Sequence, residues 1–415
     1  MESARQYGCL EGFEIGITST PVIDRRQGPH GTIYTVAMSK DAQGRYIHRL
    51  YALDLRTGAE ELGEPVEIHA TFAGGNPFDP KQYAEWAALL LSNGVIYTTW
   101  TSHCDINPYN GWIIGYDART LKQSAALDIT PNGEEGAIWQ SGAGPAADRQ
   151  GYIYLMAANG TFDTALNSSG FPSRGDSGNS FLKLSTLGRT LVVADYFTMF
   201  DVVKENAADG DLGSGGPMVL PDMTDASGKI RRLAVGAGKD LNLYLVNRDA
   251  MGKFNPRGNQ NIYQELPHAM KHSFSRHIPA YFNGRLYYAS TDDTLREYRF
   301  QNARLISEPI SQTTLKFPYP GASPSISANG EKDAIVWAVE NIDGEHTEKG
   351  TPAVLHAFDA ADLSHELYNS NQAPSGRDHF GKDNKFITPM IANGKVYVGT
   401  TNGVGVFGLL PKRVQ

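Results

Sequence analysis

Cysteine is scarce in this sequence, and long apolar runs are missing from it. The chain of 415 residues has two cysteines, Cys9 and Cys104. Two are too few for a disulfide framework, so they either form a single bridge in an oxidising compartment or remain free thiols. No run of 18 apolar residues occurs, which predicts that no helix spans a membrane. No segment carries a sustained helical period either, so an α-helical fold is not indicated.

The sequence also lacks an excess of positive charge. Its formal net charge is −8, which argues against nucleic acid or an anionic membrane surface as the main partner. No secretory leader begins at Met1, and the sequence is therefore consistent with a mature or trimmed form. Two N-glycosylation sequons, at Asn159 and Asn167, combine with the possible disulfide to favour a secreted protein. The oligomeric state is left open.

Signatures of the common catalytic chemistries are missing as well. The eleven histidines form no HExxH motif and no Cys/His spacing typical of zinc sites, so no metal is predicted. The glycine pairs at Gly142–Gly144 and Gly236–Gly238 lack the third glycine of a dinucleotide-binding loop. No serine stands in a G-x-S-x-G nucleophile elbow. We therefore expect neither a metal nor a bound cofactor.

Glycine and short alternating segments are abundant instead. The clearest example is the stretch Gly31–Gly58, in which residues 32–39 and 48–55 alternate apolar and polar side chains, as half-buried strands do. Between and after them, Asp54 can accept hydrogen bonds from turn amides, and Gly58 can take the positive φ that other residues resist. A hairpin of this size cannot bury its own faces, so it needs neighbouring sheets.

The hairpin pattern returns along the chain, preceded each time by a short apolar segment. We count seven such units of roughly 45 to 70 residues with about four strands each, which is the pattern of a β-propeller. The sequence therefore predicts an all-β fold: one seven-bladed propeller domain over residues 1–415. The last unit ends one strand short, and we expect residues near the N-terminus to supply that strand. The alternative is an eight-bladed propeller that lacks its first blade.

Several segments resemble a known family. The turn YALDLRTG at Tyr51–Gly58 resembles the repeat of quinoprotein-like (PQQ-like) propellers, and GITSTPVID, IWQSGAGPAAD and IANGKVYVGT look like segments of secreted bacterial and fungal members. Members usually carry one further blade ahead of the first one here. Quinone-dependent dehydrogenases of this fold commonly use vicinal cysteines and a Ca²⁺ held by acidic residues and Asn, and neither motif is found in this sequence. A fungal branch consists of hetero-Diels–Alder cyclases, which the resemblance makes a possible activity.

Candidate site residues follow from position. In a propeller, the residues just before each inner strand face a shared axial mouth, where ligands commonly bind. The predicted substrate-binding residues are Tyr83, Glu85, Trp86, Trp139, Gln140, Phe274, Tyr319, His379 and Phe386. The predicted catalytic donors are Arg276, His277 and His272. Glu85 and Trp86 replace a Gln-Arg pair of the relatives, and Phe274, Arg276 and His277 replace small residues, as a new ligand would require.

The favoured hypothesis is a cofactor-independent enzyme that binds a hydrophobic small molecule in the axial pocket. Its most specific form is a hetero-Diels–Alder cyclase that joins a quinone methide or tropolone to a terpene, with aromatic rings to hold the substrate and a cationic or imidazole donor to polarise a carbonyl. One alternative is a non-catalytic secreted binding or scaffold propeller. Another is a PQQ-dependent dehydrogenase. The mouth side chains could also merely fill the axis, with Trp139 packed between blades.

Overall fold

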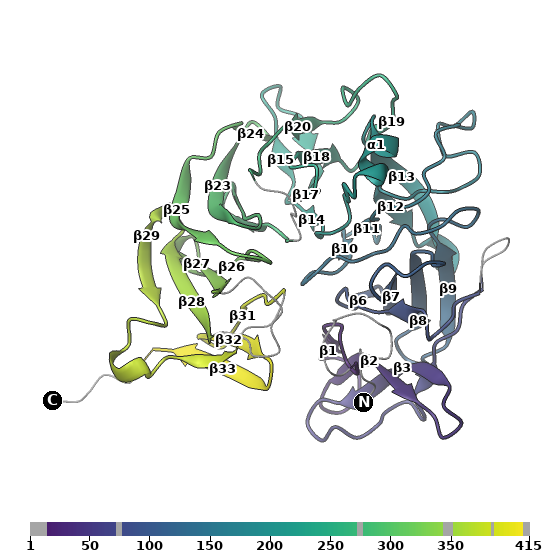
Figure 1. Cartoon of the computed structure of the whole chain (residues 1–415), viewed down its shortest axis with the longest axis horizontal. Helices are drawn as coiled ribbons and strands as arrows, with labels where there is room; N and C mark the ends of the chain where they lie inside the picture. Colours follow the sequence, from purple (N-terminus) through teal and green to yellow (C-terminus); the bar gives the residue numbers. More distant parts are fainter. Residues whose placement is uncertain (1–14, 72–76, 272–276, 343–351, 383–385, 410–415) are drawn as a thin grey trace. The chain divides into compact units, whose positions relative to one another are not determined.

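The structure is a computed structural model that describes residues 15–71, 77–271, 277–342, 352–382 and 386–409 (Figure 1). The chain forms two compact units. Unit 1 comprises residues 1–219, 233–240 and 244–265, and unit 2 comprises residues 220–232, 241–243 and 266–415. Almost all regular structure is β, and the one α-helix of the described residues is α1 (Val202–Ala207). The sequence did not predict this short helix.

Unit 1 carries the sheets of the first four blades, except for one terminal residue of β18 and one of β20, which belong to unit 2. The strands of the first two are β1 (Val22–Asp24), β2 (Thr32–Lys40), β3 (Tyr46–Asp54) and β4 (Val66–Glu67), then β5 (Tyr83–Ala84), β6 (Leu90–Ser92), β7 (Val95–Ser102), β8 (Trp112–Asp117) and β9 (Gln123–Asp128). Those of the third and fourth are β10 (Ala146–Ala147), β11 (Ile153–Met156), β12 (Phe181–Ser185), β13 (Val192–Thr198) and β19 (Lys253–Phe254), then β14 (Met218–Val219), β17 (Leu233–Ala237), β18 (Leu243–Asn247) and β20 (Gln264–Leu266). Neighbouring strands are antiparallel except β13 and β19.

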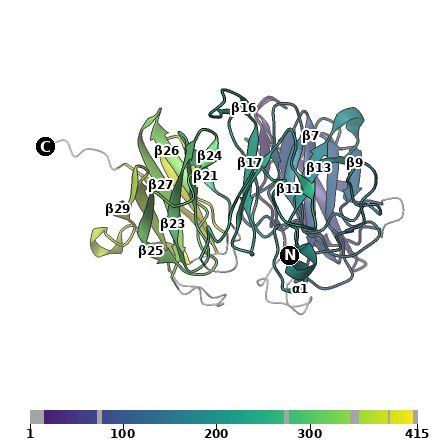
Figure 2. The same cartoon turned by 90° about the horizontal axis from the view of Figure 1, so that it is seen from above.

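Unit 2 carries the remaining three blades and a separate hairpin, β15 (Met223–Thr224) with β16 (Ile230–Arg231). The fifth blade has β21 (Ala280–Phe282), β22 (Arg285–Tyr288), β23 (Asp293–Gln301), β24 (Arg304–Leu305) and β25 (Ser311–Phe317). The sixth has β26 (Ser325–Asn329), β27 (Lys332–Asn341), β28 (Pro352–Asp359), β29 (Asp362–Asn369) and β30 (Phe380–Lys382). The seventh has β31 (Met390–Ala392), β32 (Lys395–Thr400) and β33 (Gly403–Gly408). Paired strands such as β26 and β27 are seen from above in Figure 2.

The opening hairpin forms as its sequence predicts. Strands β2 and β3 pair over nine residues, from Thr32 opposite Asp54 to Lys40 opposite Tyr46. The Asp54 carboxylate accepts hydrogen bonds from the backbone nitrogens of Arg56 and Thr57, at 3.0 and 2.8 Å. Gly58 has φ +71° and donates to the Asp54 carbonyl oxygen at 2.8 Å. The side-chain turn and the left-handed glycine together direct the chain out of β3.

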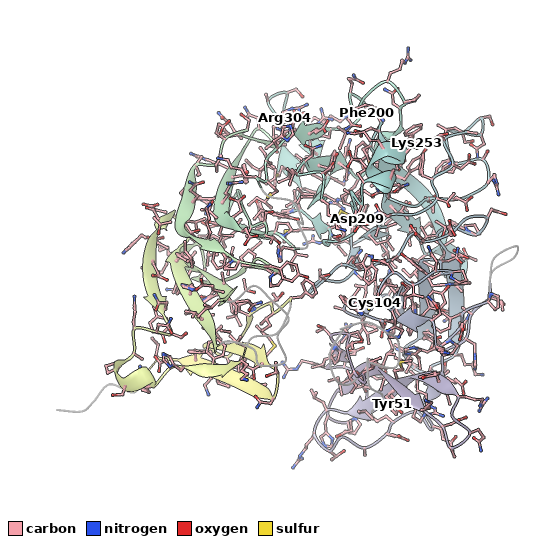
Figure 3. All side chains as sticks on the ribbon, viewed as in Figure 1. Tyr51, Cys104, Phe200, Asp209, Lys253 and Arg304 are labelled. Atoms are coloured by element: carbon pink, nitrogen blue, oxygen red, sulfur yellow. The ribbon has the colours of Figure 1, made fainter. Side chains whose placement is uncertain are left out.

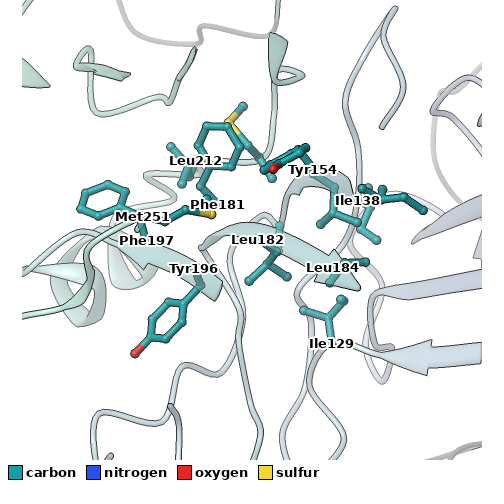
Figure 4. Close-up of a cluster of buried hydrophobic side chains, with 14 of the residues drawn as sticks. Ile129, Ile138, Tyr154, Phe181, Leu182, Leu184, Tyr196, Phe197, Leu212 and Met251 are labelled. Atoms are coloured by element: carbon teal, nitrogen blue, oxygen red, sulfur yellow. The ribbon is translucent and has the colours of Figure 1, made fainter. Parts of the chain in front are cut away.

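Apolar side chains from neighbouring sheets of unit 1 pack into shared cores. One large cluster contains Phe181, Leu182 and Tyr196, all fully buried, together with side chains from the second, third and fourth blades (Figure 4). Burial of a side chain of this size is worth roughly 1.5–3 kcal/mol. These cores hold neighbouring sheets together and so support the loops that lead into each blade.

The prediction of an all-β fold with seven propeller blades of about four mostly antiparallel strands is confirmed. The seventh blade has three strands among the described residues, as the repeat predicts. The segment expected to supply its fourth strand, residues 1–14, lies outside the described residues. The expectation of a single domain over residues 1–415 stays a prediction. No helix in the described part of the chain is long and apolar enough to cross a membrane.

Candidate functional site

The segments that lead into the first strands of blades 1 to 4 are connected to one another. We call residues 18–20, 85–89, 139–144 and 211–214 the entry segments. Backbone nitrogens of Leu89, Ala88 and Ser141 donate to the carbonyl oxygens of Thr20, Ala143 and Ser214, at 3.0, 2.6 and 3.2 Å. The approach is close: a Cβ on Gly144 would lie 2.7 Å from the Ala88 carbonyl oxygen, so only glycine fits there. Within unit 1, backbone hydrogen bonds therefore connect each of the four entry segments to the next one.

Glu85 is the most unusual side chain in these segments. It is 2% exposed, and its Oε2 accepts a hydrogen bond from the Ser19 hydroxyl at 2.9 Å. Its backbone carbonyl oxygen accepts from the Thr18 hydroxyl at 2.6 Å, which fixes the segment against blade 1. Oε1 is buried and has no hydrogen-bond partner among the described residues. A buried polar atom without a partner is rare in folded proteins and calls for an explanation.

Burial raises the pKa of Glu85 to about 8. The Ser19 hydrogen bond lowers this pKa, but its effect is the smaller of the two. The carboxyl group is therefore a neutral acid near pH 7. Tyr116 is fully buried nearby, and its pKa is raised by burial first and by the Glu85 charge second. Its hydroxyl also has no hydrogen-bond partner among the described residues. Glu85 Oε1 and the Tyr116 hydroxyl are thus two buried polar groups without a hydrogen-bond partner among the described residues.

The raised pKa of Glu85 predicts a loss of stability as the pH rises from about 4.5 to about 8. The unfolded chain releases this proton near the ordinary value of 4.5, whereas the folded chain keeps it up to about pH 8. Between these values the folded state binds more protons, so the free energy of unfolding falls as pH rises, by up to about 1.4 kcal/mol per pH unit. Below pH 4.5 both states are protonated and the effect is absent.

Glu85→Gln is the matched variant for this prediction, because it keeps the shape and removes the titration. Asp128, whose pKa burial raises to about 7, adds a dependence of the same sign in both proteins. From pH 5 to pH 8, we expect the unfolding free energy of the wild type to fall relative to that of Glu85→Gln, because only the wild type carries the titrating group. Urea denaturation at each pH measures it. Parallel curves for the two proteins would mean that Glu85 is already ionised in the folded state.

Trp86 and Trp139 form an aromatic pair beside Glu85. Their ring centroids lie 5.3 Å apart with an interplanar angle of 77°, an edge-to-face contact. Both side chains are half-buried. Edge-to-face pairs add about 0.5–1.5 kcal/mol beyond the burial of area. The contact holds the two half-buried rings in a defined geometry.

Tyr83 and Gln140 are brought to the same region, but both are occupied by the protein. The Tyr83 ring stacks on Phe78 with centroids 4.7 Å apart, and its hydroxyl accepts from Trp112 Nε1 at 3.2 Å and the backbone nitrogen of Asn110 at 3.1 Å. Gln140 is fully buried, and its side-chain amide bridges the Gly144 carbonyl oxygen and the Met156 nitrogen, both at 3.1 Å. The polar groups of both side chains therefore already have partners within the protein.

The other described candidates belong to unit 2. His277 is buried, its Nε2 donates to the Pro320 carbonyl oxygen, and its Nδ1 faces the Ser323 hydroxyl at 3.4 Å. A carbonyl oxygen can only accept, so the proton is on Nε2. Tyr319 and Phe386 are half-buried and His379 is exposed. The ring of His277 therefore stabilises the turn at Pro320, which precedes the sixth blade. Its predicted catalytic role stays a prediction.

Three predicted residues, His272, Phe274 and Arg276, lie outside the described residues. The predictions made for them are therefore unchanged. Sequence reasoning also gave no weight to Ser19 and Tyr116. Ser19 belongs to a small polar run, TST, ahead of an apolar strand, and this run was the available signal. Tyr116 had none, because its proximity to Glu85 depends on the pairing of β5 and β8 with β7.

Cys104 takes part in a disulfide, and it is labelled in Figure 3. The sequence has only one other cysteine, Cys9, which lies outside the described residues. The sequence left the choice between a bridge and free thiols open, and for Cys104 the structure decides it. Disulfides persist mainly in oxidising compartments. Cys104 lies in the loop between β7 and β8, in unit 1.

A quinone cofactor with Ca²⁺ is the group that the resemblance implies, and the residues do not fit it. In residues 15–409, apart from the gaps in the structure, no group of three or more His, Cys, Asp or Glu side chains is placed to hold a metal ion. The vicinal cysteine pair of the quinone enzymes is missing from the sequence. The entry segments contain two acidic side chains, and one of them, Asp211, is already paired: it accepts from Lys239 at 2.6 Å and from Ser214 at 2.8 Å. We derive no step through this cofactor.

Comparison with known proteins supports the fold and not the chemistry. No family model matches the chain, and no curated protein matches it. Among solved structures it is similar to a quinohemoprotein alcohol dehydrogenase from Pseudomonas putida HK5, with 13% identity and a TM-score of 0.54 over 89% of this chain and 60% of that one. A quinohemoprotein alcohol dehydrogenase from Comamonas testosteroni gives 13% identity and a TM-score of 0.50 over 92% and 70%.

The class that the fold and the comparisons define is a seven-bladed β-propeller. The chain spans 60% of the length of the first of these two enzymes. At 13% identity the likeness concerns the fold alone, and the same fold carries many chemistries. The function must therefore be argued from the residues of the entry segments.

Proposed function

We propose that the chain is a cofactor-independent enzyme that binds a flat hydrophobic molecule at the entry segments of unit 1. Trp86 and Trp139 hold the rings of the substrate, and Glu85 supplies an acidic proton. The observation that carries the proposal is the buried, neutral carboxyl group with an unpartnered Oε1, next in sequence to a half-buried tryptophan pair. Acids with raised pKa values cluster at functional sites.

The proposal assumes one of the two positions that the acidic proton of Glu85 can take. The Ser19 hydroxyl donates to Oε2, so Oε2 acts as the carbonyl-type acceptor. The proton of the neutral acid then belongs on Oε1, which has no acceptor among the described residues. A carbonyl or enol oxygen of a substrate would give this O–H its partner. In a site from which water is excluded, such a bond strengthens as negative charge develops on the substrate oxygen.

The specific reaction that we propose is a hetero-Diels–Alder cyclisation between a quinone methide or tropolone and a terpene alkene. Two new σ bonds form at the expense of π bonds, nothing is oxidised, and no group leaves. The reaction itself needs only the orientation of the two partners and a donor for the heterodiene oxygen. Orientation can supply up to about 7–11 kcal/mol of the barrier in the best cases. Removal of one well-placed donor typically costs about 10²–10³ in rate.

In this proposal, Glu85 takes the role of hydrogen-bond donor that the sequence analysis gave to Arg276, His272 and His277. His277 already donates to the Pro320 carbonyl oxygen, and the other two lie outside the described residues. Arg276→Ala nevertheless remains a useful variant, because a fall in turnover would support the original prediction. Glu85 and the two tryptophans, by contrast, make contacts within a single unit. We therefore base the test on these three residues.

The experiment measures the rate and stereochemistry of cycloaddition between a quinone methide, generated in solution, and a terpene alkene. We expect wild-type protein to accelerate the reaction and to give one enantiomer in excess. Glu85→Gln should lower the rate about 10²-fold with little change in substrate affinity, because the amide is a weaker donor of similar size. Equal rates and racemic product with and without protein would contradict the cyclase proposal.

Two alternatives correspond to other outcomes of the same study. A protein that binds the aromatic substrate without accelerating the reaction would be a binding or scaffold propeller. Oxidation of an alcohol only after addition of the quinone and Ca²⁺ would identify a dehydrogenase. The two similar structures are both alcohol dehydrogenases. Either result would overturn the proposed reaction while leaving the seven-bladed fold unchanged.

A further inference from the structure

The segment 163–176 is an ordered hairpin. It is closed at its base by a bridge between Phe162 and Ser177 and near its tip by one between Leu166 and Pro172. The Tyr196 hydroxyl donates to the Gly170 carbonyl oxygen at 2.9 Å and holds the tip against β13. The tip is therefore a fixed, exposed feature of unit 1.

Asn167, the acceptor asparagine of the second sequon, lies at this tip. Its side chain and those of Ser168 and Ser169 are exposed. Its Oδ1 accepts hydrogen bonds from the backbone nitrogens of Ser169 at 2.9 Å and Phe171 at 3.1 Å. The Nδ2 makes no hydrogen bond to any residue of the described chain. A group attached to Nδ2 would therefore extend into solvent without breaking a contact.

Asn159, the acceptor of the first sequon, has the opposite environment. It is half-buried, its Nδ2 donates to Asp209 at 3.0 Å, and its Oδ1 accepts from Asn179 at 3.3 Å. Its backbone nitrogen donates to the Asp211 carboxylate at 2.8 Å. The next residue, Gly160, packs so closely that a Cβ there would lie 2.2 Å from the nitrogen of Gly136. A sugar on Asn159 would disrupt this packing between blades.

We propose that Asn167 is an N-glycosylation site and that Asn159 stays unmodified in the folded protein. The donor is an oligosaccharide linked through diphosphate to a polyprenol lipid. The Asn167 amide nitrogen forms a bond to C1 of the first sugar, the C1–O bond to the diphosphate breaks, and the amide loses one proton. The disulfide at Cys104 supports passage through the oxidising compartment in which this reaction occurs. The glycan adds a bulky polar group to the outer tip of the hairpin.

The test is expression of the full chain behind a secretion signal in yeast, followed by digestion with an enzyme that removes N-glycans. We expect a shift in gel mobility for the wild type and for Asn159→Gln, and none for Asn167→Gln. Ser169→Ala is the matched control, because it removes the sequon hydroxyl and keeps the Asn167 side chain that caps the turn. It should abolish the shift as well. Peptide mass analysis of the wild type then identifies the modified asparagine.

A secreted, folded protein that carries its glycan on Asn159, or no N-glycan at all, would overturn the proposal. Retention of the mobility shift in both Asn167→Gln and Ser169→Ala would overturn it too. The result does not bear on the proposed cyclase activity, because the hairpin and the entry segments use different residues.

Discussion

Replacement of Trp86 by alanine is expected to weaken the binding of an aromatic ligand by about 10- to 100-fold. Trp86 supplies half of the edge-to-face pair at the entry segments, and its loss removes both ring surface and the contact that orients Trp139. Tryptophan is enriched among the residues whose truncation costs the most binding energy. The factor of 10 to 100 corresponds to about 1.4–2.8 kcal/mol.

The measurement is calorimetric titration with tropolone, a flat ring with a carbonyl and a hydroxyl group. Trp337→Ala is the matched control: this tryptophan is also half-buried, but it lies on β27 of unit 2, where its Nε1 donates to Ser327 at 2.8 Å. Its replacement should leave tropolone affinity unchanged. Equal affinity of wild type and Trp86→Ala, with a loss in Trp337→Ala, would place the ligand elsewhere.

The second large effect is a loss of stability in unit 1 when Arg248 is replaced by alanine. Arg248 is 5% exposed and forms an ion pair with Asp148 at 3.1 Å. The same carboxylate oxygen accepts from the Tyr154 hydroxyl at 2.9 Å. Removal of the guanidinium leaves a buried carboxylate without its counter-charge, which typically costs about 3–5 kcal/mol. We expect the free energy of unfolding to fall by this amount near pH 7.

Urea denaturation followed by tryptophan fluorescence measures this loss. Four of the five tryptophans, Trp86, Trp100, Trp112 and Trp139, belong to unit 1, so the signal reports chiefly on the unit that contains the ion pair. Arg26→Ala is the control, because Arg26 is 93% exposed in its pair with Asp24 and its removal should cost less than about 1 kcal/mol. A loss below 1 kcal/mol for Arg248→Ala would show that Asp148 is solvated or neutral.

The fold could be predicted from local patterns because each blade is a local object. The alternation in β2 and β3 and the Asp54–Gly58 turn act over a few residues, and a repeat of such hairpins already implies the blade count. This locality explains why the prediction of seven blades could be made from the sequence, and the sheet topology confirms it. The helix α1 was missed because its six residues are too short for a helical period to emerge.

The candidate site could be predicted only in part. The position of Glu85 and Trp86 ahead of a strand, and their departure from relatives, were enough to select them. The protonation of Glu85 could not be predicted, because it depends on burial against Ser19, which is 66 residues away in sequence. Tyr83 illustrates the same limit. Its pattern suits a ligand contact, yet its hydroxyl is occupied by Trp112 and Asn110, and only the tertiary structure reveals this.

The central claim is that an aromatic substrate lies on Trp86 and Trp139 with its oxygen near a neutral Glu85. A crystal structure of the protein with tropolone bound tests it most directly. We predict the ring in van der Waals contact with both tryptophans and its carbonyl oxygen within hydrogen-bond reach of Glu85 Oε1, directly or through one water. Tropolone bound away from both rings, with Glu85 unchanged, would contradict the claim.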